Sequence, residues 1–267
     1  MSSIDELFTK LRSENRKALM PFITAGDPDL DFTASVLQEL VARGASMCEV
    51  GIPYSDPIAD GPVIQASYTR ALNKGIKLNN ILKTLSNEAP QLAAPLVTMI
   101  SYAIIYRHGV EKYADALKQS GVAGMIVPDL PVEESPRLAK VCQTRDLSLI
   151  QLVSPLTPRD RALKIADTSS GFIYYVSVAG ITGERTELPP ELAERVSWLR
   201  EQTPLPVCIG FGISKPEHVK LLAPVADGLI VGSAIVRRMA DVETDGRETT
   251  LKQIGDYVES LLTALEQ

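Results

Sequence analysis

The chain is poor in the residues that most metal-dependent and covalent enzymes use. It holds 2 histidines, His108 and His218, and 3 cysteines in 267 residues. No grouping of histidines, cysteines and carboxylates resembles a zinc or iron site, and no G-x-S-x-G segment predicts a nucleophilic serine. The predicted strands also lack an interior lysine for Schiff-base chemistry. We therefore expect no metal and no covalent mechanism, and we expect both isolated histidines to lie on the surface.

The cysteines, Cys48, Cys142 and Cys208, are odd in number and show no paired spacing. Cys48 and Cys208 lie in apolar runs, where a reduced cysteine behaves as a small hydrophobic residue. The pattern indicates no disulfide framework and favours a reducing compartment. The first residues lack the apolar core of a secretory signal, and no apolar run is long enough to span a membrane. We expect a cytoplasmic protein with no membrane partner.

Positive charge is not concentrated anywhere along the chain. Lysine and arginine number 27 against 33 aspartates and glutamates, which leaves a formal net charge of −6. Without a basic stripe, a nucleic-acid partner is not expected. Small anions stay possible as ligands, because backbone amides at a helix start can bind phosphate without nearby basic residues.

Eight short apolar runs recur along the chain, separated by amphipathic segments such as LDFTASVLQELVARG and GVEKYADALKQSG. Nearly continuous apolar strands are typical of parallel sheets that are buried on both faces, and strands alternating with helices indicate βαβ units. The number of repeats favours a (β/α)₈ TIM barrel over an open doubly wound sheet, which is the alternative. The runs are ALMPFIT, ASMCEVGI, PLVTMIS, AGMIVPD, LSLIQLV, GFIYYVS, LPVCIGF and DGLIVGS.

We expect residues 1–267 to form a single TIM-barrel domain of the α/β class with an extra N-terminal helix. No linker or low-complexity tract divides the chain, and its length suits one barrel of roughly 250 residues. The predicted helix has Ser3 as its possible cap and one apolar face, made of Ile4, Leu7, Phe8 and Leu11. Two long segments, 53–62 and about 177–190, follow predicted strands at the end where barrels of this type carry their chemistry.

Glu49 is an anomaly, because it lies in an apolar strand beside Cys48 and Val50. Burial of an ionised carboxylate is costly, so its pKa should be raised. A carboxyl group with such a pKa suits general acid–base catalysis. The alternative is a glutamate that is paired inside the barrel, and position alone does not separate the two.

Asp60 follows Glu49 closely, in a loop that also contains Ser55 and Asp56. Its simplest role is to cap the helix that begins near Pro62. Because the loop starts just after Glu49, however, both carboxylates can face one cavity, and a pair in different environments can divide acid–base and charge-stabilising roles.

A phosphate site is predicted near the end of the chain, where glycines follow two strands. The main-chain amides of Gly212, Ile213 and Gly232 and the hydroxyl of Ser233 suit a phosphate at helix starts, and barrels often hold phosphate after their seventh and eighth strands. The segment around Thr182 could complete the site. For any one glycine, a tight turn is the simpler explanation.

Six segments resemble the tryptophan synthase alpha chain family, in order and over nearly the whole chain. The segment E-x-G-x-P-x-S-D-P-x-x-D-G-P is the most specific of them. The segments are PFITAGDP at 21–28, EVGIPYSDPIADGPVIQ at 49–65, PDLPVEES at 128–135, SVAGITG at 177–183, GFGIS at 210–214 and GSAIV at 232–236.

The resemblance implies a lyase that splits indole-3-glycerol phosphate into indole and glyceraldehyde 3-phosphate in tryptophan biosynthesis. Glu49 is then the catalytic acid–base, Asp60 stabilises charge on the indole ring, and Thr182 closes the second loop over Asp60. Tyr174 is preferred to Tyr175 as the tyrosine near both carboxylates, by counting to Ser177. Ring contacts map to Phe22, Ile100, Tyr102 and Val127, and phosphate contacts to Gly183, Gly212, Gly232 and Ser233; packing in the barrel is the alternative for Phe22, Ile100 and Val127.

The resemblance also implies a partner, the beta subunit of an alpha2beta2 heterotetramer. Pyridoxal phosphate would belong to that subunit, so no cofactor is expected in this chain, and Pro53, Asp56 and 128–135 would face the partner. Three other functions stay open: a free-standing lyase, a weakly catalytic regulatory subunit and a different phosphate-binding barrel. Intact Glu49 and Asp60 argue against the second, and the segment joining them disfavours the third.

Overall fold

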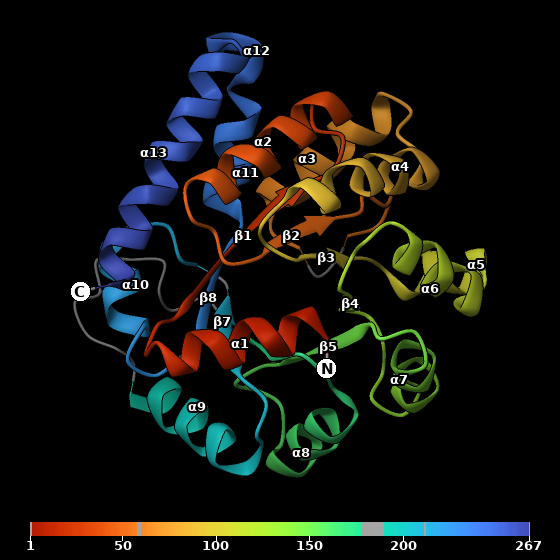
Figure 1. The fold of residues 1–267 in the computed structure, drawn as a ribbon. Coiled ribbons are helices and arrows are strands. Elements are labelled where there is room, and N and C mark those ends of the chain that lie inside the picture. Colours follow the sequence, from red (N-terminus) through yellow and green to blue (C-terminus); the bar gives the residue numbers. More distant parts are fainter. Residues whose placement is uncertain (1, 58–59, 178–189, 211, 267) are drawn as a thin grey trace.

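The described part of the chain closes into a barrel of parallel strands inside a ring of helices (Figure 1). The computed structural model describes residues 2–57, 60–177, 190–210 and 212–266. The strands pair in chain order, and β1 closes the ring by pairing with β8. The predicted barrel is therefore confirmed, and the open sheet is wrong. The strands are β1 (Ala18–Thr24), β2 (Cys48–Gly51), β3 (Leu96–Met99), β4 (Gly124–Ile126), β5 (Ser148–Val153), β6 (Ile173–Val176), β7 (Val207–Gly210) and β8 (Gly228–Val231), each within one of the eight apolar runs.

Helices follow the strands and cover the outside of the barrel. Several connections carry more than one helix, most of all after β8, where α11, α12 and α13 succeed one another. The helices are α2 (Leu30–Ala42), α3 (Pro62–Asn73), α4 (Leu78–Glu88), the 3₁₀ turn η1 (Ala89–Gln91), α5 (Tyr102–His108), α6 (Val110–Gln119), α7 (Ser135–Gln143), α8 (Arg159–Thr168), α9 (Pro190–Gln202), α10 (Pro216–Leu222), α11 (Ser233–Ala240), α12 (Val242–Asp245) and α13 (Arg247–Leu265).

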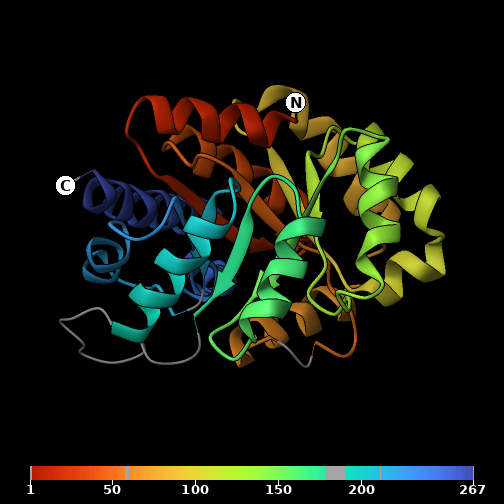
Figure 2. The same cartoon turned by 90° about the horizontal axis from the view of Figure 1, so that it is seen from below.

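The extra N-terminal helix is present as α1 (Ser3–Ser13) and lies across one end of the barrel (Figure 2). Its cap is Ser2, whereas we expected Ser3. The Ser2 hydroxyl accepts a hydrogen bond from the Asp5 amide at 3.2 Å, and the Asp5 carboxylate accepts one from the Ser2 amide at 2.9 Å. This reciprocal pair satisfies two amides that the first turn leaves free, so the helix begins one residue earlier than a Ser3 cap would allow.

Two apolar layers result from the alternation of side chains along each strand. Side chains that point into the barrel pack under α1, where the Phe8 and Phe172 rings lie 5.9 Å apart. Those that point outward pack against the ring of helices. Tyr174 belongs to the inner layer and Tyr175 to the outer one. The barrel interior is therefore filled by apolar side chains at the α1 end.

The structure corrects one sequence prediction about histidine. His218 is 5% exposed on α10, where its Nδ1 accepts a hydrogen bond from the Ser214 amide at 3.3 Å. His108 is half-buried, with its ring centroid 6.2 Å from that of Tyr113. An isolated histidine suggests a surface residue, because the sequence does not show that its ring nitrogen accepts a hydrogen bond inside the fold. The cysteines are free and buried, as expected, and no described helix is both long and apolar enough to cross a membrane.

Candidate active site

A cavity of about 1070 Å³ opens at the carboxyl ends of the strands, opposite α1. Chemistry in this fold is located at that face, because the loops after the strands meet there. Segments as far apart in the chain as β1 and α11 contribute to its wall. The structure brings eight of the predicted site residues to this one cavity: Phe22, Glu49, Asp60, Tyr174, Gly212, Ile213, Gly232 and Ser233.

Glu49 points into the cavity from β2, between Phe22 on β1 and Val97 on β3 in the strand register. The residue is 2% exposed, and its Oε1 has no hydrogen-bond partner among the described residues. Burial, and then the charge of Asp60, raise the pKa of Glu49 to about 8. The described residues therefore do not support the alternative of a glutamate paired inside the barrel. A pKa raised in this way favours the protonated form of Glu49 at neutral pH.

Asp60 also lines the cavity, and only Gly61 separates it from α3. The cap of α3 is Gly61, and no side chain bonds to the first turn, so the helix-cap interpretation of Asp60 is wrong. Its main chain is held instead, because its amide donates to the Pro57 carbonyl at 3.1 Å and its carbonyl accepts from Gln65 Nε2 at 2.8 Å. These bonds fix the backbone and leave the carboxylate directed at the cavity.

The two carboxyl groups differ in protonation at neutral pH. Burial raises the pKa of Asp60 to about 6, and a hydrogen bond from the Tyr54 hydroxyl opposes that rise. With the pKa of Glu49 at about 8, a solution near pH 7 contains a protonated Glu49 beside an ionised Asp60. Groups whose environments separate their pKa values in this way can act as an acid and as a stabiliser of positive charge.

Two glycines allow the aromatic side chains of the cavity to approach the strands. A Cβ at Gly51 would collide with the Phe22 ring, and a Cβ at Gly210 would collide with the Tyr174 hydroxyl. Burial raises the pKa of Tyr174 well above its usual value, and the charges of Glu49 and Asp60 raise it further. The Tyr174 hydroxyl is thus a neutral donor near both carboxyl groups, whereas Tyr175 faces the outer core.

Three of the predicted phosphate residues, Gly212, Gly232 and Ser233, line the same cavity. Gly232 caps α11 without a side-chain bond, so the first-turn amides after Ser233 lack a side-chain acceptor, which is the arrangement that binds phosphate at helix starts. Gly212 has a φ of +79°, which favours glycine. His218 supports the same turn through the Ser214 amide. Thr182 and Gly183 lie outside the described residues.

Three predicted ring contacts do not line the cavity. Ile100 and Val127 are buried in the outer apolar layer, which agrees with barrel packing. Tyr102 begins α5, where its amide donates to Asp129 Oδ1 at 2.7 Å. Their contact with a substrate ring stays a prediction.

Sequence reasoning missed several residues of the wall. Met99, Leu152 and Ile230 line the cavity from three strands, and Arg238 and Tyr257 reach it from α11 and α13. The alternation of side chains along a strand could have predicted these three residues. Met99 and Leu152 each lie two positions after an inward-facing residue, and Ile230 itself faces inward. No local signal places α13 at the cavity, because its packing against α11 is a tertiary contact.

The fold and the cavity define a barrel enzyme with an acid–base pair of carboxyl groups and a helix start suited to phosphate. A family model described as tryptophan synthase alpha chain matches residues 8–265. The tryptophan synthase alpha chain of Rhodopirellula baltica is 56% identical and is matched over 100% of this chain and 99% of its own length. That of Arabidopsis thaliana is 43% identical, over 98% and 95%. The chain therefore belongs to the tryptophan synthase alpha chain family.

Solved structures agree with this assignment. The crystal structure of tryptophan synthase subunit alpha from Legionella pneumophila has a TM-score of 0.90 at 34% identity and covers 100% of this chain and 99% of that one. A tryptophan synthase complex from Pyrococcus furiosus contains a chain with a TM-score of 0.83 at 35% identity, covering 93% and 99%.

Proposed function

We propose that Glu49 and Asp60 carry out the retro-aldol cleavage of indole-3-glycerol phosphate to indole and glyceraldehyde 3-phosphate. This is the carbon–carbon lyase reaction of the family, in tryptophan biosynthesis. The observation that supports these roles most directly is the pair itself: two carboxyl groups in one cavity with pKa values of about 8 and about 6.

Glu49 supplies the proton that starts the cleavage. Protonation of indole C3 makes the ring a cation, and the electrons of the bond from C3 to the glycerol carbon then return to the ring as that bond breaks. The hydroxyl on the same glycerol carbon loses its proton to Glu49, which leaves the aldehyde. Glu49 thus gives one proton and regains one, and the protonated ring itself is the electron sink. The chain needs no cofactor of its own for this chemistry.

Asp60 stabilises the intermediate cation. As a carboxylate it accepts a hydrogen bond from the indole nitrogen, and Coulomb attraction in a partly desolvated cavity is stronger than in water. The Phe22 ring and the neutral Tyr174 hydroxyl border the same space. Gly212, Gly232 and Ser233 hold the phosphate at the start of α11, and Gly183 and Thr182 complete the site on the grounds of the resemblance.

The working enzyme is an alpha2beta2 heterotetramer, in which the beta subunit holds pyridoxal phosphate and consumes the indole. The relative from Pyrococcus furiosus was solved as a tryptophan synthase complex, which supports a complex for this chain as well. Within this proposal the chain acts in the cytoplasm.

Glu49→Gln tests the mechanism, because the amide keeps the shape of the side chain but cannot exchange the proton. We expect the rate of indole release to fall by at least about 10³-fold, at the upper part of the usual range for loss of an acid–base group. Glu88→Gln is the matched control, since Glu88 is also buried but bonds to Gln38 on the outside of the barrel. If Glu49→Gln retained near wild-type release, the assigned mechanism would be wrong.

The same assay separates the remaining functions. Slow release by the chain alone and a large rise on addition of a beta subunit support the heterotetramer. Fast release that a beta subunit does not change supports a free-standing lyase. A chain that activates the beta subunit but releases no indole is the regulatory alternative.

A further inference from the structure

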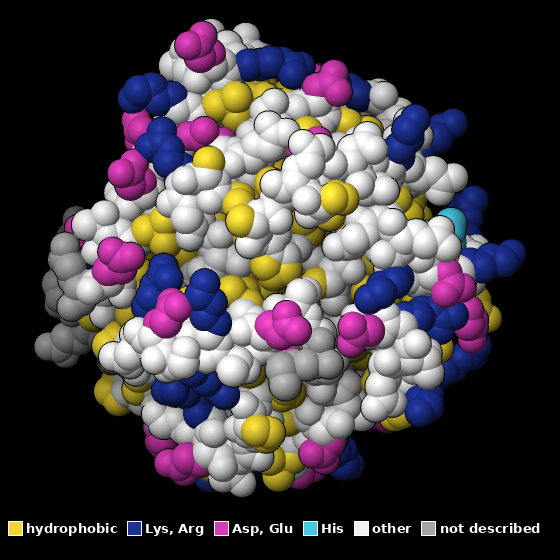
Figure 3. Space-filling view, in the orientation of Figure 1, with side chains coloured by type: hydrophobic (Ala, Val, Ile, Leu, Met, Phe, Trp, Pro, Cys, Tyr) yellow, Lys and Arg dark blue, Asp and Glu magenta, His cyan; other side chains and the backbone are white. Residues whose placement is uncertain are grey.

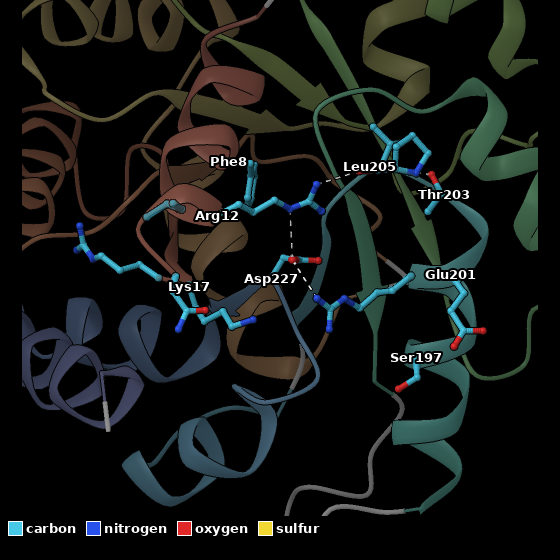
Figure 4. Close-up of a pocket in the computed structure, with 13 residues that line it drawn as sticks. Phe8, Arg12, Lys17, Ser197, Glu201, Thr203, Leu205 and Asp227 are labelled. Carbon is cyan, nitrogen blue, oxygen red and sulfur yellow. Dashed lines mark hydrogen bonds and ion pairs between the residues drawn. The ribbon is translucent and has the colours of Figure 1, made fainter.

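A second cavity lies at the opposite end of the barrel from Glu49 and has a volume of about 580 Å³ (Figure 4). Its wall combines the end of α1, the end of α9 and the residues that directly precede strands. Lys17 precedes β1, Leu205 lies just before β7, and Asp227 precedes β8. The cavity is therefore at the amino ends of the strands, and none of its described lining residues also lines the candidate active site.

Positive charge is concentrated in this cavity, although the chain as a whole is acidic. Four basic side chains line it, those of Arg12, Arg16, Lys17 and Arg200, against the acidic Glu201 and Asp227. Basic side chains also gather on the molecular surface where α1 lies beside α9 (Figure 3). A chain with a net charge of −6 thus has a local excess of cations at one point.

Arg12 and Arg200 each have partners in the cavity before any ligand binds. Arg12 lies 3.6 Å from Asp227 and donates to the Pro204 carbonyl at 3.1 Å. Arg200 lies 3.3 Å from the same carboxylate and donates to the Val225 carbonyl at 3.3 Å. These bonds leave further N–H groups of both guanidinium groups available, at a reduced entropic cost of binding.

The Asp227 carboxylate already has partners for both of its oxygens, and its one negative charge does not neutralise all the positive charge around it. It is 6% exposed, and its second oxygen accepts a hydrogen bond from the Val207 amide at 2.9 Å. Together, Arg12, Arg200 and Lys17 outnumber this one carboxylate by two positive charges.

Lys17 is the group without a partner. Within the described ranges 2–57, 60–177, 190–210 and 212–266, its ammonium group makes no hydrogen bond and no ion pair. Burial lowers the pKa of Lys17, and the charge of Asp227 only partly opposes this. An ammonium group that loses hydration without a close counter-charge is costly, and a bound anion would remove that cost. Figure 4 shows Arg12 above Asp227 and joined to it by a dashed line, with Lys17 to the lower left.

We propose that this cavity binds a phosphate dianion, either inorganic phosphate or the phosphate group of a small ester, through Lys17, Arg12 and Arg200. Two net positive charges match a dianion, and guanidinium groups fit phosphate oxygens in pairs. The site is separate from the proposed lyase chemistry and does not depend on it.

Equilibrium dialysis with radiolabelled inorganic phosphate tests the proposal at constant ionic strength. The full chain carries Ser233→Asp in every sample, so that the charge at the start of α11 repels phosphate from the candidate active site. We expect one phosphate to remain bound per chain. Lys17→Met in this background should weaken binding about tenfold, and Lys17→Arg should retain it, since the charge is kept.

The matched control is Lys10→Met, which removes a lysine of α1 that does not line the cavity and should leave binding unchanged. No residual binding in the Ser233→Asp chain, or equal binding by Lys17→Met and Lys10→Met, would overturn the proposal. Competition by glycerol 3-phosphate distinguishes the sources: displacement tighter than by phosphate itself supports an ester, and weaker displacement supports free phosphate as the ligand.

Discussion

The two ends of the barrel surround a buried carboxyl group with opposite environments, one without hydrogen-bond partners among the described residues and one with several. At the carboxyl end, Glu49 is 2% exposed with an unpartnered oxygen and a pKa of about 8. At the amino end, Asp227 is 6% exposed but is bound by two arginines and the Val207 amide. Burial alone therefore does not mark a functional group. A buried acid without partners contributes to chemistry at the expense of stability, whereas a buried acid with partners holds the fold together.

Asp60→Asn should give the largest effect that follows from this comparison. The amide cannot neutralise a cation on the indole ring, so we expect the rate of indole release to fall by about 10²–10³-fold, as for loss of one charge-stabilising group. The free energy of unfolding should change little, because no described residue depends on the Asp60 carboxylate except the donor Tyr54. Steady-state indole release and urea unfolding measure the two quantities. A variant that lost stability but kept its activity would contradict the assignment.

Asp227→Ala should show the reverse pattern. The change leaves the Val207 amide without its acceptor and removes the counter-charge of Arg12 and Arg200. We expect the free energy of unfolding to fall by about 2 kcal/mol, the usual size for a hydrogen bond to a charged group, with indole release unchanged. Asp146→Asn is the control, since Asp146 is exposed and its carboxylate lies 3.8 Å from the Lys118 ammonium group. Equal unfolding curves for both variants would mean that Asp227 is not structural.

The pH dependence of kcat/KM should be bell-shaped with a maximum near pH 7. The reaction needs an ionised Asp60, with a pKa of about 6, and a protonated Glu49, with a pKa of about 8. Activity should fall about tenfold for each pH unit beyond either limit, because one group is then in the wrong state. A rate that continued to rise above pH 9 would exclude Glu49 as the acid.

Stability should respond to Glu49 over the same pH range. The folded state binds the Glu49 proton more tightly than the unfolded state, whose pKa is near 4.5. The penalty for ionising this group is absent below pH 4.5 and is complete above the folded pKa of about 8. Wild type should therefore lose stability relative to Glu49→Gln as the pH rises from 5 to 9. Thermal unfolding at several pH values measures this, and a constant difference would contradict the raised pKa.

Tyr54→Phe should have the smallest effect. It removes the hydrogen bond that stabilises ionised Asp60, so the acidic limb of the pH profile should move to higher pH. We expect a loss of about two- to fivefold in indole release at pH 7, which corresponds to about 0.5–1 kcal/mol for one hydrogen bond. Tyr106→Phe, at an exposed tyrosine on α5, is the control and should leave the profile unchanged.

Much of the fold could be predicted from the sequence, because its signals are local. Each apolar run is long enough for one strand, and glycines such as Gly44 and Gly75 end helices with positive φ. Glu49 was predictable as a perturbed acid, since a charged residue inside an apolar run is anomalous wherever the run is placed. That residues 1–267 form one domain stays a prediction.

The tertiary structure decided those features that depend on contacts between distant segments of the chain. It showed that Asp60 is not a helix cap, that His218 is buried against the Ser214 amide, and that Ile100 and Val127 face the outer core. It also brought Lys17 and Arg200 together around Asp227. The amino-acid sequence by itself determined the strands, the barrel and the buried acid, because hydrophobicity and its period act over a few residues. Closure of the barrel determined which polar side chains lie close together, because no local sequence pattern predicts the distance between residues that are far apart in the chain.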